Sequence, residues 1–122
     1  MKPIVDIKKS LISFKFAWKG IIELARIENN FKVHILSATA VIALSAYFEI
    51  TKTEWLFVIS GIAAVMITEA INTCIEKIID KISPDYNKEA GQIKDIAAAS
   101  VLLSALYSVI IAFIIFIPYI FQ

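Results

Sequence analysis

The sequence predicts an all-α membrane protein, with three transmembrane helices and an N-terminal amphipathic surface helix in a single domain, residues 1–122. Two observations predict this class. Hydrophobic residues make up 59% of the chain and the mean hydropathy is +0.77, which is more apolar surface than a folded soluble chain of this length can bury. Three apolar runs are also long enough to cross a bilayer, whose hydrocarbon core needs about 20 helical residues.

The N-terminal segment, about residues 4–27, has the period of an amphipathic helix. Its apolar residues recur at steps of three and four, and charged residues occupy the other faces. Because lysines recur too often for this helix to span a bilayer, we expect it to lie in the interface, with Trp18 as an anchor. Packing against the other helices on the aqueous side is the alternative. The apolar positions are Ile7, Leu11, Phe14, Trp18, Ile21, Ile22 and Ala25.

The three spans are expected at about residues 31–49, 54–82 and 94–118. The second has an apolar first half and a polar second half. It ends at Ser83, because the residue before Pro84 avoids the helical conformation. A polar stretch to Ile93 leads to the third span, which carries no charged residue after Asp95 and ends near Pro118.

The charges near the spans predict the orientation of the chain. Seven Lys and Arg residues precede the apolar part of the first span, one lies between the first and second spans, four lie between residues 77 and 94, and none follows the third span. Positively charged residues are retained on the cytoplasmic side. We therefore expect a multi-pass protein of the inner (plasma) membrane. Its N-terminus and second connection would be cytoplasmic, on the side where ATP is available.

A polar stripe runs along the second half of the second span. At about 100° per residue, Glu69, Asn72, Glu76 and Asp80 fall within an arc of about 80° on one helix face. Counted from Trp55 at about 1.5 Å per residue, Glu69 lies about 21 Å along the helix, inside the cytoplasmic half of the membrane core. An acid at this depth is costly, and it usually marks a functional site. An acid that only pairs with a lysine to hold helices together is the alternative.

Further charged residues are expected at the same boundary of the membrane. Glu28 precedes the first span and Lys94-Asp95 opens the third. Converging carboxylates can hold Mg²⁺, which bridges to substrate phosphates, and a lysine can neutralise the phosphates of ATP. Phosphoryl transfer needs little beyond a metal, a cation and a base for the attacking hydroxyl, and Glu69 suits the base. The pattern by itself indicates a polar site at the membrane edge and leaves its reaction open.

The residues around this stripe resemble a known family. The E-x-x-N-x-x-x-E-x-x-x-D pattern of residues 69–80, followed by Lys-Asp-Ile-Ala-Ala-Ala at residues 94–99, is similar to the signature of the prokaryotic diacylglycerol kinase family. That family includes diacylglycerol kinases and the undecaprenol kinases typical of Gram-positive bacteria. Residues 13–20 and 28–34 extend the resemblance over nearly the whole chain. The turn at residues 83–86 is more similar to the undecaprenol-type branch.

The resemblance implies a homotrimeric lipid kinase with active sites between neighbouring subunits. Such an enzyme moves the γ-phosphate of ATP, with Mg²⁺, to the hydroxyl of a membrane lipid alcohol, which is undecaprenol or diacylglycerol. The residues with implied roles in the chemistry are Glu69 as the general base, Glu28 and Glu76 as holders of Mg²⁺, Lys94 on the phosphates with Asp95 beside it, and Asn72 as the residue that orders the polar site.

The same resemblance implies nucleotide contacts from the surface helix and from the second connection. Lys9 and Phe16 match nucleotide-side positions of the surface helix. Family members often have tyrosine where Phe16 stands, and phenylalanine cannot donate the corresponding hydrogen bond. Asp85, Tyr86 and Asn87 match a segment that touches the nucleotide, and family members often have histidine at the last of these positions.

Two other positions are interpreted mainly as structural. Ala98 belongs to a small-residue surface at residues 97–100, which favours close helix packing in lipid, and room for the lipid substrate is its second interpretation. His34 lies at the start of the first span, where an imidazole can hydrogen-bond a neighbour or lie among headgroups.

Two other functions remain open from the sequence. A small oligomeric transporter or channel would use Glu69 as its coupling site, although a transport path would place polar groups in both halves of the membrane. A membrane scaffold would use the charges only to pair helices. The scaffold predicts that Glu69→Gln preserves function, whereas the kinase predicts that the same substitution abolishes transfer.

Overall fold

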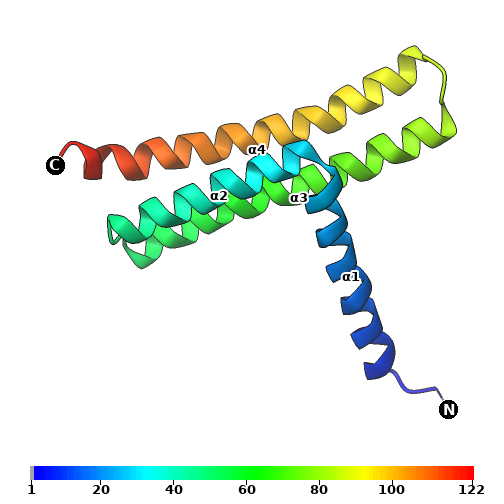
Figure 1. Cartoon of the computed structure of the whole chain (residues 1–122), viewed down its shortest axis with the longest axis horizontal. Coiled ribbons are helices and arrows are strands. Elements are labelled where there is room, and N and C mark those ends of the chain that lie inside the picture. Colours follow the sequence, from blue (N-terminus) through cyan, green and yellow to red (C-terminus); the bar gives the residue numbers. More distant parts are fainter. Residues whose placement is uncertain (1) are drawn as a thin grey trace.

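The computed structural model describes residues 2–122, which form four α-helices and no strand. Helices α2, α3 and α4 lie side by side, whereas α1 leaves this bundle steeply at the start of α2 (Figure 1). The hairpin formed by α3 and α4 extends well past the junction of α1 and α2 (Figure 1). The four helices are α1 (Ile7–Ile27), α2 (Asn29–Tyr47), α3 (Lys52–Ile82) and α4 (Lys88–Ile120).

Helix α1 begins at a capping residue and ends at a single non-helical residue. The Asp6 carboxylate accepts a hydrogen bond from the backbone N–H of Lys9 at 3.1 Å, which satisfies a free donor of the first turn. Glu28 then has an extended backbone, with φ −98° and ψ 114°, so the chain turns before α2 begins. Of the described residues in α1, none is buried. Its position is therefore determined mainly by the junction with α2.

The turn between α2 and α3 is fixed by backbone hydrogen bonds and by a capping box. Glu49 has a positive φ of 51°, and the N–H of Ile50 donates to the carbonyl of Ser45 at 3.2 Å. The Thr51 hydroxyl accepts from the N–H of Glu54, while the Glu54 carboxylate accepts from the N–H of Thr51. The start of α3 is thereby fixed.

Helix α4 begins at Lys88, so most of the polar stretch that was expected to precede the third span is helical. The Asn87 side chain causes this early start, because it accepts hydrogen bonds from the N–H groups of Glu89 and Ala90 at 2.9 and 3.2 Å. The helix also continues past Pro118 to Ile120. A proline in the last turn removes one backbone donor, which a helix end tolerates better than a helix interior.

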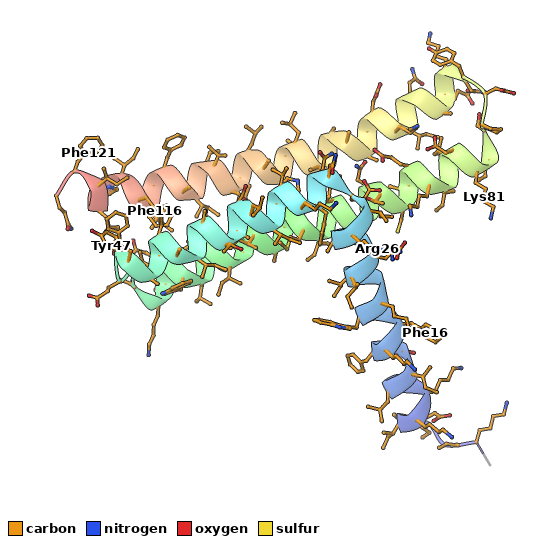
Figure 2. The ribbon with its side chains drawn as sticks, viewed as in Figure 1. Phe16, Arg26, Tyr47, Lys81, Phe116 and Phe121 are labelled. Atoms are coloured by element: carbon orange, nitrogen blue, oxygen red, sulfur yellow. The ribbon has the colours of Figure 1, made fainter. Side chains whose placement is uncertain are left out.

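The main apolar core lies at the end of the bundle that holds the α2–α3 turn and the C-terminus. Figure 2 shows Tyr47, Phe116 and Phe121 at this end and Lys81 at the opposite end. Phe48 packs against the core, with its ring centroid 6.2 Å from that of Phe116. The buried residues of the core are Ile50, Val58, Ile111, Ile115 and Phe116.

Much of the apolar surface of α3 and α4 stays exposed in the single chain. Leu103 and Ile114, for example, are 67% and 69% exposed. Among the described residues, α3 and α4 are the two helices that are long and apolar enough to cross a membrane. Helix α2 does not reach this apolarity, because its first turns carry Asn29, Asn30, Lys32 and His34.

Candidate active site

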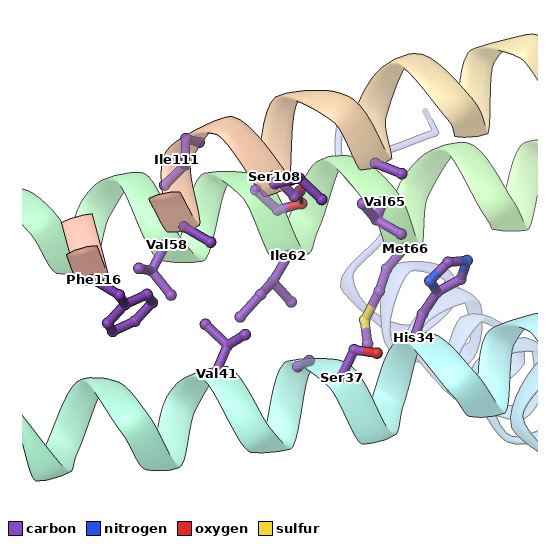
Figure 3. Close-up of a pocket in the computed structure, with 15 residues that line it drawn as sticks. His34, Ser37, Val41, Val58, Ile62, Val65, Met66, Ser108, Ile111 and Phe116 are labelled. Carbon is purple, nitrogen blue, oxygen red and sulfur yellow. Dashed lines mark hydrogen bonds between the residues drawn. The ribbon is translucent and has the colours of Figure 1, made fainter. Parts of the chain in front are cut away.

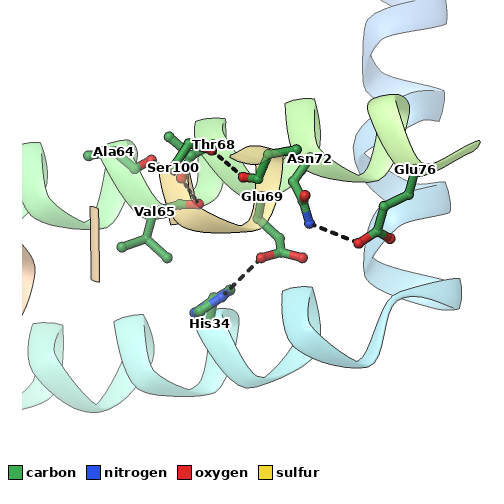
Figure 4. A network of polar contacts seen from close by, with 9 residues as sticks. His34, Ala64, Val65, Thr68, Glu69, Asn72, Glu76 and Ser100 are labelled. Carbon is green, nitrogen blue, oxygen red and sulfur yellow. Dashed lines mark hydrogen bonds and ion pairs between the residues drawn. The ribbon is translucent and has the colours of Figure 1, made fainter. Parts of the chain in front are cut away.

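The buried polar residues of α3 lie where the bundle changes from apolar to polar. Glu69 and Asn72 are only 3% and 5% exposed, and Thr73 beside them is 4% exposed. Glu76, one turn further along, is half-buried. The helical period that was used on the sequence places these side chains on one face, and that face is turned into the bundle (Figure 4).

Helix α2 supplies the opposite side of this site. The Nε2 atom of His34 lies 3.4 Å from the Oε2 atom of Glu69. Figure 4 shows the Glu69 carboxylate between α3 and α2, with one oxygen facing the imidazole ring. His34 is 22% exposed at its side chain, whereas Glu69 is 3% exposed. The site therefore has a buried acid with a partly accessible imidazole beside it.

Asn72 connects this acid to the next one along the helix. Its Nδ2 atom donates a hydrogen bond to Oε1 of Glu76 at 3.3 Å. Within residues 2–122, its Oδ1 atom is buried and has no hydrogen-bond partner, and the same holds for Oγ1 of Thr73. Buried acceptors are rarely left without a partner. The stripe therefore has free oxygen acceptors that a ligand or a water can engage.

A second charged group lies further out along the α3–α4 hairpin. Nζ of Lys94 is 2.7 Å from Oδ1 of Asp80, and the two side chains are 38% and 65% exposed. Asp95, next to Lys94, is exposed. In this structure Lys94 thus contacts Asp80, whereas the resemblance implies a contact with the phosphates of ATP.

The two residues expected to hold Mg²⁺ are both half-buried. Glu28 lies in the junction of α1 and α2, and Glu76 lies on α3. Among residues 2–122, no three His, Cys, Asp or Glu side chains form a ready-made metal site. Oxygen donors are nevertheless what Mg²⁺ prefers, and it usually binds through one or two carboxylates together with waters and phosphates. The oxygen atoms of Glu76 and the free Oδ1 of Asn72 fit that chemistry.

The other residues expected in the site lie on different surfaces of the single chain. Lys9 and Phe16 are exposed on α1, which projects away from the bundle (Figure 1). Asp85 and Tyr86 are exposed in the turn between α3 and α4, and Tyr86 is 94% exposed. Asn87 caps α4, and Ala98 is exposed on α4. The described chain therefore brings together the stripe of α3 and His34, and it leaves these six other positions apart from them.

An apolar cavity of about 210 Å³ adjoins the polar site. It lies between α2, α3 and α4, begins beside His34 and Met66, and extends toward Phe116 (Figure 3). Its lining is mostly aliphatic, with Ser37 and Ser108 as polar members. A polar site and an apolar cavity are therefore adjacent, as a site for an amphiphilic molecule requires.

Sequence reasoning did not find the contact between His34 and Glu69. The available signal was a polar, ionisable residue within an otherwise apolar helical run, which is an indication of function in a membrane segment. The contact joins two helices that are separated by a turn, so the helical period of either one cannot show it.

The fold and the site together define a class: an all-helical protein with candidate membrane spans and a buried acidic site beside an apolar cavity. Comparison with known proteins then identifies the family. Residues 15–116 match the model of the prokaryotic diacylglycerol kinase family. The chain belongs to this family, and it is a lipid kinase of the membrane. An enzyme is therefore supported over the transporter and the scaffold.

Individual relatives are similar over most of the chain. An undecaprenol kinase of Bacillus subtilis is 34% identical over 113 residues, which cover 93% of this chain and 92% of the relative. A diacylglycerol kinase of Synechocystis is 30% identical over 109 residues, which cover 88% of this chain and 62% of the relative. A diacylglycerol kinase of Escherichia coli K12 is 26% identical over 95 residues, which cover 78% of each chain.

Proposed function

We propose that the protein transfers the γ-phosphate of ATP to the hydroxyl group of undecaprenol at the cytoplasmic surface of the membrane. The observation that carries the proposal is the buried Glu69, which has His34 beside it and an apolar cavity next to it. A lipid alcohol can place its hydroxyl at the acid and its chain in apolar surroundings. Undecaprenol is favoured over diacylglycerol because the undecaprenol kinase is 34% identical, whereas the diacylglycerol kinases compared are 30% and 26% identical.

In the proposed reaction Glu69 takes the proton of the lipid hydroxyl as its oxygen attacks the γ-phosphorus. The new O–P bond forms as the bond to the bridging oxygen of ADP breaks. Lys94 would exchange Asp80 for the phosphates, and Asn72 would keep Glu76 oriented through their hydrogen bond. Asp95 follows Lys94 in the chain and would lie beside it at the phosphates.

Magnesium would be held by Glu28 and Glu76, and it would neutralise the phosphate charge. Nucleotide contacts are proposed for Lys9 and Phe16 on α1 and for the turn at residues 85–87, and Ala98 would border the lipid. In the single chain α1 projects away from α3 (Figure 1). A homotrimer, in which a neighbouring subunit completes each site, would account for this separation. The expected topology has α1 in the interface and three spans formed by α2, α3 and α4.

The direct test uses purified protein in lipid or detergent, with labelled ATP and Mg²⁺. Undecaprenol and diacylglycerol are offered separately, and label in the lipid fraction is measured. We expect transfer to both classes to be detectable and kcat/KM to be higher for undecaprenol. An equal or higher kcat/KM for diacylglycerol would refute the substrate assignment.

The role of Glu69 is tested by Glu69→Gln. An amide cannot accept the hydroxyl proton, so we expect kcat to fall by about 100-fold or more, with helix content and oligomeric state unchanged. The matched control is Glu49→Gln, which removes an exposed acid in the α2–α3 turn at the other end of the bundle. Glu49→Gln should keep the activity. A folded Glu69→Gln protein with full activity would exclude Glu69 as the base.

A further inference from the structure

We propose that His34 is a positioning residue, whose Nε2–H holds Oε2 of Glu69 so that Oε1 stays available for the proton of the lipid hydroxyl. This inference rests on the proposed role of Glu69 as the base. The proposal gives α2, the helix that faces the acidic stripe of α3, a role in the reaction through His34.

The contact itself is the first support. Nε2 of His34 and Oε2 of Glu69 are 3.4 Å apart, and Figure 4 shows the other carboxylate oxygen turned away from the ring. The separation is somewhat longer than an ordinary N–H···O hydrogen bond. Contacts between catalytic groups are often long without substrate and tighten when it binds. A small rotation of the imidazole would bring Nε2 of His34 to hydrogen-bonding distance of Oε2 of Glu69.

The burial of Glu69 is the second support. With 3% of its side chain exposed, water cannot orient the carboxylate, and an acid without a partner is costly at such a position. The terminal torsion of a glutamate is broad, so burial by itself does not fix which way the two oxygens point. A donor on one oxygen removes that freedom. Proton transfer requires the base to be placed accurately, so fixing the carboxylate increases the rate of the chemical step.

No other ionisable group competes for His34 among the described residues. On α3, Glu76 accepts from Asn72 instead. Near the junction, the exposed pair Glu23 and Arg26 of α1 are 2.9 Å apart and engage each other.

Helix α4 offers His34 no charge either. Its contributions to the shared cavity are apolar residues and Ser108, and Lys94 lies against Asp80. The one acid that His34 contacts in the described chain is therefore Glu69.

A purely structural role is the competing explanation, because His34 also lines the apolar cavity. Two substitutions separate the roles. His34→Gln keeps a side-chain N–H donor of similar reach, and His34→Leu keeps the bulk but removes the donor. We expect His34→Leu to lower kcat by about 10- to 100-fold, with KM for ATP changed less than about threefold, and His34→Gln to restore most of kcat.

Equal kcat values for the leucine and glutamine variants would overturn the proposal. So would full activity of His34→Leu. Thermal unfolding and size-exclusion chromatography in detergent verify that each variant folds. If His34→Leu does not fold, His34→Met, which is also apolar but more flexible, takes its place in the comparison.

A double-mutant cycle tests whether His34 acts through Glu69. Glu69→Asp keeps a carboxylate but shortens the side chain, so it should retain part of the activity and lose the contact. In that background His34→Leu should lower kcat less than threefold, whereas independent effects would multiply. If Glu69→Gln is inactive and the cycle shows independent effects, only the role of His34 is refuted. If Glu69→Gln is fully active, the role of Glu69 as the base is refuted too.

Discussion

Asn72 has one committed and one free polar atom in a buried site. Its amide nitrogen is committed to Glu76 at 3.3 Å, while its Oδ1 is buried and unpartnered within the described chain. An unpaired buried acceptor costs free energy that a polar ligand or a water can recover. The residue therefore orients one acid and offers an oxygen to whatever binds between Glu69 and Glu76.

The pair of Lys94 and Asp80 leads to a prediction at the same scale. Both side chains are substantially exposed, at 38% and 65%, and exposed ion pairs contribute little to stability. Lys94 can therefore leave Asp80 for a phosphate at small cost. We expect Lys94→Met to raise KM for ATP by roughly tenfold or more, because a charge-assisted contact to phosphate is lost.

Asp80→Asn is the matched control for the same pair. It also breaks the ion pair, but it leaves the lysine free, so KM for ATP should stay the same or fall. Both variants should unfold within a few degrees of the parent protein. The measurements are ATP saturation curves and thermal unfolding, and an equal rise of KM in both variants would show that the pair itself is what matters.

At the scale of elements, the contact of α3 with α4 depends on a close approach of backbones. Ser108 Oγ donates to the carbonyl of Gly61 at 2.8 Å, and at the adjacent position of each helix Ser60 Oγ and Tyr107 Oη are 3.0 Å apart. Small residues allow helices in lipid to approach closely, where hydrophobic attraction between helices is weak. The two long helices are therefore joined by polar contacts as well as by packing.

Gly61→Ala is expected to destabilise the bundle. A Cβ at this position would lie 2.9 Å from Ser108 Oγ and 3.4 Å from Ser108 Cα, so the helices must separate or the serine must lose its bond. We expect a loss of about 1–3 kcal/mol in the free energy of unfolding.

Gly91→Ala is the control, since no described atom lies within 4 Å of a Cβ added there. It should leave stability unchanged or raise it by up to about 1 kcal/mol, because alanine favours the helix. Unfolding in mixed detergent, followed by circular dichroism, gives both values. Similar stabilities for the two variants would contradict the close-approach argument.

The whole molecule has two unlike ends. The end with the α2–α3 turn holds the apolar and aromatic core, whereas the α3–α4 turn carries charged and exposed residues (Figure 2). Helix α1 leaves the bundle between these ends, and the α3–α4 hairpin extends beyond it (Figure 1). If α1 lies along the cytoplasmic surface of the membrane, as proposed, the hairpin tip projects into the cytoplasm.

Cysteine labelling tests this topology. Cys74 is the single cysteine of the chain and is exposed, so Cys74→Ser provides a background for Glu49→Cys and Tyr86→Cys. With three spans, a membrane-impermeant maleimide added to intact spheroplasts should label residue 49, and it should label residue 86 only after permeabilisation. Labelling of both without permeabilisation would exclude α3 as a span, and labelling of residue 2, introduced as Lys2→Cys, together with residue 49 would exclude α2.

Much of the helical structure and of the acidic stripe can be predicted from the sequence, because the signals that predict them are local. The helical period places Glu69, Asn72 and Glu76 on one face, and Pro84 limits the length of α3. The family pattern consists of residues close together on α3 and at the start of α4, so it can be recognised without a fold. The helical conformation of residues 88–93 was not predicted, because the capping role of Asn87 was not recognised.

Only the tertiary structure decided which helices bring their side chains together. Three contacts join different helices: His34 faces Glu69, Lys94 pairs with Asp80, and Gly61 closely approaches Ser108. The turns and the packing of whole helix faces set these distances, and no periodicity within one helix encodes them. The sequence thus determined most of the helical segments, the family and the acidic stripe, while the packing of α2 and α4 against α3 determined which polar side chains meet between helices.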